Sequence, residues 1–201
     1  MKTVILHGLG QTPRDWDGVA GLLPALNIDC PELFSTAKTE ALTYPSLLAQ
    51  LEARYADHTE PLRLCGLSLG AVLALDYTIR HPEKVASLVW IAGQLRSPSA
   101  LVDIQNLIFR CLPSRMFAGM GLSKQDVIQL ARSMRSLDLT PGLGRVTCPV
   151  DVVCGARDRA NQKAAQVLAD LLPQARLHII PGAGHQVNTD APETIAAILN
   201  Q

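Results

Sequence analysis

The segment 66–70 reads Gly-Leu-Ser-Leu-Gly and places one serine, Ser68, between two glycines. An apolar run, 62–65, precedes it and a helical run, 71–80, follows it, with no polar spacer on either side. This G-x-S-x-G pattern, at a sharp turn from a strand into a helix, exposes a nucleophilic serine at a helix N-terminus, where developing negative charge is favoured. We predict that both glycines serve close backbone approach, because a Cβ at either would crowd the neighbouring chain. The alternative, a plain Gly-Ser loop, is disfavoured by the flanking runs.

A serine hydroxyl needs an adjacent base, and His185 is the best placed of the five histidines. It lies in the Gly-rich loop 181–185, directly after the apolar run 177–180. We therefore expect His185 on the same edge of the fold as Ser68, against the alternative of an exposed loop histidine. The remaining histidines suit hydrogen bonding at a strand junction, helix ends or the last strand: His7, His58, His81 and His178.

The base needs an orienting acid, and Asp158 is favoured for that role. It follows the apolar run 150–154 by a few residues, which brings it to the edge expected for His185. Its alternative role is an Asx-turn or a helix cap, because a helix follows it. Asp103 is the second candidate. Asp151 lies inside a strand and Asp190 caps a helix, so both are weaker candidates.

Acyl transfer also needs two amides aimed at the developing oxyanion. The backbone N–H of Leu69, the residue after the serine, is the first candidate. The turn at 7–9, which follows the first apolar run, offers the N–H of Leu9 as the second. Only backbone groups are used, so apolar side chains at these two positions are compatible with the role.

Strands alternating with helices must position these residues. Short apolar runs that end at glycine, proline or polar loops predict strands at 3–6, 28–30, 62–65, 85–92, 150–154 and 177–180. Helices are expected over about 13–23, around 47–55, from the serine to about residue 81, over 164–172, and at the C-terminus. Such alternation predicts an α/β fold with a doubly wound, mainly parallel sheet of about six strands. In this architecture ligands bind beyond the carboxyl ends of the strands.

Residues 93–147 exceed what one crossover needs. Within this segment 101–111 and 125–137 have helical patterns, so we expect a helical insertion that caps the serine. Candidate side chains for an apolar acyl pocket under this cap are Met116, Phe117, Met120 and, less specifically, Leu122. The alternative is that these side chains only attach the cap to the body.

Size and composition favour one globular domain over residues 1–201. Hydrophobic residues make up 48% and charged residues 18%, which excludes a disordered chain. Eighteen basic residues balance eighteen acidic ones, so no basic field recommends nucleic acid as a partner. The five cysteines form no C-x-x-C pair, which favours free thiols and gives no metal-ligand spacing. With neither a signal peptide nor a membrane span in the sequence, we expect a cytoplasmic protein.

The sequence resembles the α/β-hydrolase superfamily over nearly its whole length. The resemblance rests on His7-Gly8 after the first strand, Trp16 opening the next helix, the segment 66–70, Asp158 and Gly184-His185, in the order Ser…Asp…His. It implies a small, short-capped member that lacks the family's first two strands. The family's Pro-Gly-x-Gly loop is replaced here at 31–35. A sheet trimmed in this way leaves one edge for exposure or for a homodimer.

These observations together predict a serine hydrolase of the carboxylesterase type. Ser68 would attack a small-molecule acyl ester, His185 would transfer the proton, and Asp158 would orient the imidazole. No cofactor is implied. A thioesterase or a carbon–carbon bond hydrolase would use the same three residues, and a catalytically silent binding protein of the same fold is an alternative from another class. A nucleotide-binding module is disfavoured because no G-x-G-x-x-G follows any strand.

Overall fold

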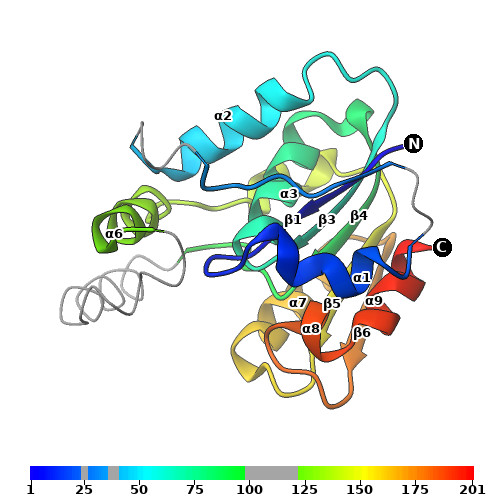
Figure 1. Cartoon of the computed structure of the whole chain (residues 1–201). Coiled ribbons are helices and arrows are strands. Elements are labelled where there is room, and N and C mark those ends of the chain that lie inside the picture. The colour runs from blue at the N-terminus through cyan, green and yellow to red at the C-terminus, as the bar shows by residue number, and fades with distance from the viewer. Residues whose placement is uncertain (24–26, 36–40, 98–121) are drawn as a thin grey trace.

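The computed structural model describes residues 1–23, 27–35, 41–97 and 122–201, and within them the chain builds one six-stranded sheet (Figure 1). The strand order is β2-β1-β3-β4-β5-β6, and every neighbouring pair is parallel. The strands are β1 (Thr3–Leu6), β2 (Ile28–Asp29), β3 (Leu62–Leu67), β4 (Val85–Ile91), β5 (Val150–Gly155) and β6 (Ala175–Ile180). The predicted α/β class and parallel sheet are confirmed.

Helices cover both faces of the sheet and divide the core into two layers (Figure 1). One face packs against α2 (Tyr44–Arg54), α3 (Leu69–Arg80) and α7 (Arg159–Leu171). The other face packs against η1 (Pro13–Trp16), α1 (Asp17–Ala20), α8 (Val187–Asp190) and α9 (Pro192–Leu199). The central strands β3 and β4 are apolar on both faces because each face meets a helical layer. Because every neighbouring pair is parallel, all six strands direct their carboxyl ends toward one edge of the sheet.

The helix expected over 13–23 is shorter than predicted. Thr12 and Asp15 form a capping box at its start, in which Thr12 N–H donates to Asp15 Oδ2 over 2.7 Å. The segment then divides into the 3₁₀ turn η1 and the single α-turn α1, which ends at Ala20 and is followed by Gly21. Glycines inside and after the turn lower helix propensity, so the pattern does not extend to residue 23.

The long segment 93–147 leaves and re-enters the sheet along a paired stem. Ser97 N–H donates to the Leu137 carbonyl and Leu139 N–H to the Leu95 carbonyl, each over 2.9 Å. These bonds flank an antiparallel bridge between Arg96 and Asp138. The described part of the segment contains α6 (Lys124–Ser133) and η3 (Thr140–Arg145), and η2 (Pro82–Lys84) precedes β4.

The helix α6 corresponds to the pattern expected at 125–137 and ends at Ser133, with Met134 as its C-cap. Figure 1 shows it standing off from the sheet beside the start of α2, where Tyr44 N–H donates to Ser133 Oγ over 2.8 Å. The helix expected at 101–111, the second acid candidate Asp103 and the pocket candidates Met116, Phe117 and Met120 all lie outside the described residues.

The cysteines in the described part of the chain are free thiols: Cys30, Cys65, Cys148 and Cys154. Burial raises the pKa of the Cys148 and Cys154 thiols to about 11, so both are protonated at neutral pH. Over the same residues, no helix has the length and apolar character needed to cross a membrane.

Candidate active site

Ser68 occupies a strained turn between β3 and α3. Its φ of 54° and ψ of −113° lie where side-chain-bearing residues are rare, and such strain is typical of functional sites. A Cβ on Gly66 would overlap the backbone of Gly70, and a Cβ on Gly70 would overlap the Leu6 carbonyl of β1. This is the close approach predicted for the two glycines, and it holds the serine at the carboxyl end of β3.

Asp158 and His185 meet at the carboxyl ends of β5 and β6. The Nδ1 atom of His185 lies 2.7 Å from Asp158 Oδ2. Because the carboxylate accepts, Nδ1–H donates and Nε2 is left as the basic nitrogen. The Asp158 side chain is 6% exposed and that of His185 is 43% exposed. The carboxylate is thus shielded while the imidazole faces solvent, an arrangement suited to proton transfer.

The alternative role of Asp158 as a helix cap has no support in its contacts. Asp158 occupies the N-cap position of α7, but its side chain makes no capping hydrogen bond. The carboxylate faces His185 instead. In the described residues, its side chain therefore contacts His185 and caps no backbone N–H of α7.

Gly155, the last residue of β5, lets the loop carrying the histidine approach the acid. A Cβ there would overlap the carbonyl groups of Ala183 and Gly184. Arg157 N–H donates to the Ala183 carbonyl over 2.9 Å, and Gly184 N–H donates to Asp190 Oδ2 over 2.6 Å. The sequence-based assignment of Asp190 as a helix cap is therefore wrong: its carboxylate holds the histidine loop from the end of α8.

Asn161 holds the acid from the first turn of α7. Its Nδ2 lies 2.9 and 2.8 Å from the two oxygens of Asp158, and its Oδ1 accepts a hydrogen bond of 2.6 Å from Gln94 Nε2. Because a carboxylate only accepts, it orients the Asn161 amide, which in turn makes Gln94 the donor. Gln94 follows β4, so three neighbouring strand ends contribute to this network.

Neither Asn161 nor Gln94 was predicted from the sequence. Asn161 stands three residues after Asp158, a spacing that brings side chains together on a helical turn and is a usable signal. Gln94 is 67 residues away from Asn161, and nothing near it in the sequence indicates the contact.

The turn after β1 lies against the turn between β3 and α3 that carries Ser68. A Cβ built on Gly8 would come 2.9 Å from Leu67 Cδ2 and 3.5 Å from Ser68 Cβ, so the missing side chain permits this approach. Leu69 opens α3, and the first amide of a helix has no acceptor within the helix. No described residue accepts a hydrogen bond from Leu9 N–H. Neither amide expected to bind an oxyanion therefore has an acceptor among the described residues.

The sequence matches the model of the alpha/beta hydrolase family over residues 3–198. The chain belongs to the α/β hydrolase family. It is 28% identical over 239 residues to the pimeloyl-[acyl-carrier protein] methyl ester esterase of Aromatoleum aromaticum, covering 98% of this chain and 95% of that protein. It is 26% identical over 230 residues to the biotin biosynthesis bifunctional protein BioHC of Cellvibrio japonicus, covering 96% of this chain and 45% of that longer protein.

Among solved structures, the enol-lactonase from Burkholderia xenovorans LB400 superposes with a TM-score of 0.85. The two sequences are 15% identical, and the match covers 99% of this chain and 90% of the lactonase, so the likeness concerns the fold. Family membership and the esterase relative together make this α/β hydrolase an enzyme of the hydrolase class.

Three other histidines of this α/β hydrolase, His7, His81 and His58, lie outside the pair formed by His185 and Asp158. His7 is buried, with Nδ1 3.0 Å from the Gly8 carbonyl and Nε2 accepting from Leu33 N–H over 3.1 Å. His81 pairs with Glu52 over 3.0 Å. His58 Nε2 is buried, and no partner for it is found in the described part of the chain. His185 contacts Asp158 through Nδ1, which leaves its Nε2 free to act as a base. None of these three histidines has that arrangement.

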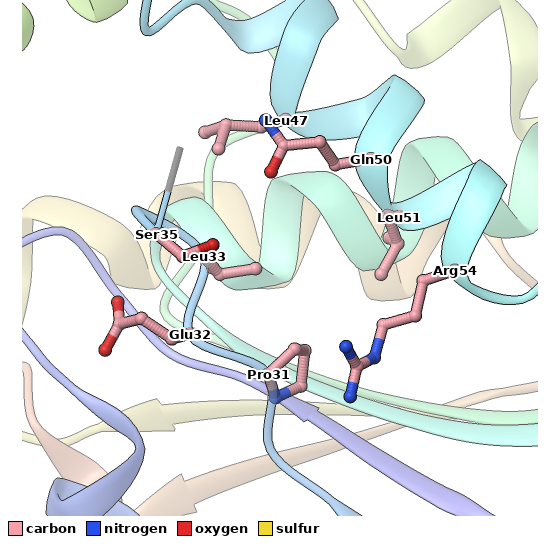
Figure 2. A pocket seen from close by; sticks show the side chains of 8 residues that line it. All are labelled: Pro31, Glu32, Leu33, Ser35, Leu47, Gln50, Leu51 and Arg54. Carbon is pink, nitrogen blue, oxygen red and sulfur yellow. The ribbon is translucent and has the colours of Figure 1, made fainter. Parts of the chain in front are cut away.

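A cavity of about 110 Å³ lies between the loop after β2 and α2 (Figure 2). Leu33, Leu47 and Leu51 line its apolar part, and Arg54 lines one end. The guanidinium of Arg54 is held by both oxygens of Asp29, at 3.1 and 3.0 Å, so its charge is already neutralised. Ser68, Asp158 and His185 do not line this cavity, and it is therefore separate from the candidate active site. Within the described residues no group of three or more His, Cys, Asp or Glu side chains is placed to hold a metal ion.

Proposed function

We propose that this α/β hydrolase is a serine esterase that acts through Ser68, His185 and Asp158. The hydrogen bond of 2.7 Å between His185 and Asp158, at the sheet edge that also carries the strained Ser68, is the observation that supports the proposal most strongly. An imidazole held through Nδ1 presents Nε2 as the base that a serine nucleophile needs.

In the proposed mechanism, Ser68 Oγ attacks the ester carbonyl carbon as His185 Nε2 takes the hydroxyl proton. The carbonyl oxygen becomes an oxyanion that accepts hydrogen bonds from Leu9 N–H and Leu69 N–H. The intermediate collapses, and the imidazolium gives its proton to the departing alcohol, which leaves an acyl group on Ser68. Water then attacks the acyl carbon while His185 takes its proton, and the imidazolium returns that proton to Ser68 Oγ as the carboxylic acid product leaves. Asp158 stays ionised and stabilises the imidazolium.

Carboxylic esters are the proposed substrate class. The relative from Aromatoleum aromaticum is named as a methyl ester esterase, which supports an ester over other acyl compounds. Thioesters and carbon–carbon bonds would pass through the same acyl chemistry, so they are the alternatives to test. We further propose that the segment 93–147 caps the site and that Met116, Phe117 and Met120 contribute to an acyl pocket beneath it. A homodimer and a cytoplasmic location stay predictions from the sequence.

The test is hydrolysis of a p-nitrophenyl ester series, from acetyl upward, by the wild type and the Ser68→Ala variant. Ser87→Ala is a matched control, since Ser87 lies near the amino end of β4, away from the carboxyl edge of the sheet that carries Ser68. We expect turnover by the wild type and the control and its loss, by at least about 10⁴-fold, in Ser68→Ala. A wild-type rate matched by Ser68→Ala would contradict the assignment. A wild type inactive on esters but active on thioesters or β-diketones would retain the mechanism and replace the substrate class.

A further inference from the structure

A buried chain of side-chain amides connects the turn after β1 to α8. Gln11 Oε1 accepts from Gly8 N–H over 3.1 Å, and Gln11 Nε2 donates to Asn188 Oδ1 over 3.1 Å. Asn188 Nδ2 then donates to the Asp15 carbonyl over 2.9 Å. Gln11 is 3% exposed and Asn188 is 1% exposed, although 177 residues separate them in the sequence. Two buried polar side chains of this kind are costly unless they are fully hydrogen-bonded, and here they satisfy each other.

The two ends of this chain determine the orientation of both amides. Gly8 N–H can only donate and the Asp15 carbonyl can only accept, so the oxygen of Gln11 must face Gly8 and the nitrogen of Asn188 must face Asp15. The middle bond from Gln11 to Asn188 follows with one possible direction. The connection therefore has a single arrangement and not two interchangeable ones.

Gln11 also helps to orient the peptide that contains Leu9 N–H. The Gly8 carbonyl accepts from Gln11 N–H over 3.1 Å and faces His7 Nδ1 at 3.0 Å. In a planar trans peptide the C=O and N–H groups point in opposite directions, so anchoring the Gly8 carbonyl directs Leu9 N–H to the other side. The Gln11 side chain holds the Gly8 N–H, and the Gln11 backbone N–H holds the Gly8 carbonyl. One residue therefore anchors both backbone polar groups of Gly8.

The far end of the connection stands close to the base. Asn188 lies in α8, three residues after His185, and the same short helix supplies Asp190, which binds Gly184 N–H over 2.6 Å. The turn expected to bind the oxyanion and the loop that carries the base are thus tied to one helix. A displacement of either would be transmitted through Gln11 and Asn188.

We propose that Gln11 and Asn188 are positioning residues that hold Leu9 N–H in place for the oxyanion and keep the turn in register with the His185 loop. This inference rests on the proposed esterase function. Neither residue touches the reacting atoms. Their contribution should appear in the transition state, where the oxyanion exists, and not in ground-state binding of the ester.

The first variant is Gln11→Met, which has a similar length and shape and removes every side-chain hydrogen bond. We expect kcat to fall about 10- to 100-fold with KM unchanged, since removal of a whole oxyanion donor costs about 10²- to 10³-fold. Asn188→Leu keeps the contact between Gln11 and Gly8 and should cost less, about three- to tenfold. Gln166→Met is the matched control, because Gln166 is exposed on α7 and its side chain bonds Asp170, away from the candidate site.

Affinity for a trifluoromethyl ketone distinguishes positioning from a general structural role. This inhibitor adds to the serine as an oxyanion and uses both amides, so its Ki should rise by the same factor by which kcat/KM falls. Thermal unfolding is recorded in parallel. A variant with lower stability but unchanged kcat and Ki would overturn the proposal and leave the esterase function standing.

Amide hydrogen exchange in the wild type tests the geometry without any variant. We expect slow exchange at Gly8, whose N–H is bonded to Gln11, and fast exchange at Leu9 in the free enzyme. After reaction with a fluorophosphonate, the phosphoryl oxygen should protect Leu9. Fast exchange at Gly8, or no protection at Leu9 in an enzyme that hydrolyses esters, would overturn the inference alone. A wild type with neither turnover nor reaction with the fluorophosphonate would overturn the proposed function and this inference together.

Discussion

Strands β5 and β6 carry two aspartate–histidine pairs that differ in what surrounds them. Asp151 and His178 lie within the strands, and Asp158 and His185 lie just beyond their ends, and each pair is joined over 2.7 Å. His178 faces its carboxylate through Nε2, whereas His185 faces its carboxylate through Nδ1. Only the second arrangement leaves Nε2, the nitrogen farther from the backbone, open toward a substrate.

The charge balance also differs between the two pairs. Arg176 binds both oxygens of Asp151, at 2.9 and 2.8 Å, so a permanent cation already neutralises that carboxylate. Asp158 instead receives the neutral amide of Asn161, which leaves its negative charge available to stabilise an imidazolium. The same two residue types therefore make a structural cluster in the sheet and a candidate catalytic pair at its edge.

The largest expected difference is between the two histidines. His185→Ala should lower kcat by at least about 10⁴-fold, because no base then remains for the serine. His178→Ala should leave kcat within about twofold, since Arg176 still neutralises Asp151. Steady-state kinetics on one ester, with thermal unfolding as the folding control, makes the comparison. Equal losses in both variants would mean that the two pairs do not differ in function.

The next largest expected difference is between Asp158 and Asp151. Asp158→Asn should reduce kcat about 10³- to 10⁴-fold with little change in stability, because an amide cannot stabilise the imidazolium and favours the wrong tautomer. Asp151→Asn should reduce the free energy of unfolding by about 1–3 kcal/mol through its buried hydrogen bonds and leave kcat nearly unchanged. Denaturant titration and initial rates measure both. Full activity in Asp158→Asn would transfer the acid role to Asp103, the second candidate.

The smallest expected effect on kcat concerns Asn161, whose amide contacts Asp158 and has no counterpart at Asp151 among the described residues. Asn161→Leu should lower kcat about tenfold at constant KM, because the carboxylate loses the donor that holds it toward His185. Asn200→Leu is the control, at an exposed position beyond α9. The downfield proton resonance of His185 Nδ1–H should shift in the first variant and stay in the second. An unchanged resonance with unchanged kcat would reduce Asn161 to a structural role.

Local sequence patterns predicted much of this fold because each strand is a short apolar run and each turn has its own chemistry. Ser68, Asp158 and His185 were predicted because each lies in the turn or loop that follows such a run, and parallel strands bring their carboxyl ends to one edge. The two strands β5 and β6 therefore had to place the acid and the base near each other. The extent of the first helix was wrong because periodicity outlasts the helix when glycines interrupt it.

The supporting residues were beyond local patterns. Gln11 and Asn188 meet across 177 residues, and Gln94 and Asn161 across 67, so no spacing in the sequence signals either contact. The polar side chains of Gln11 and Asn188 would also be assigned to the surface until their burial is known. The residues that hold the candidate site in place depend on tertiary packing, whereas the residues proposed to carry the chemistry lie at turns that the sequence predicts.

The most direct test of the central claim is to find the nucleophile covalently. The enzyme is treated with a fluorophosphonate, digested, and its peptides are analysed by mass spectrometry. We predict one phosphonyl adduct, located on Ser68, whose rate of formation falls sharply in His185→Ala but stays near wild type in His178→Ala. An adduct on another residue, or equal rates in both histidine variants of an active enzyme, would contradict the account.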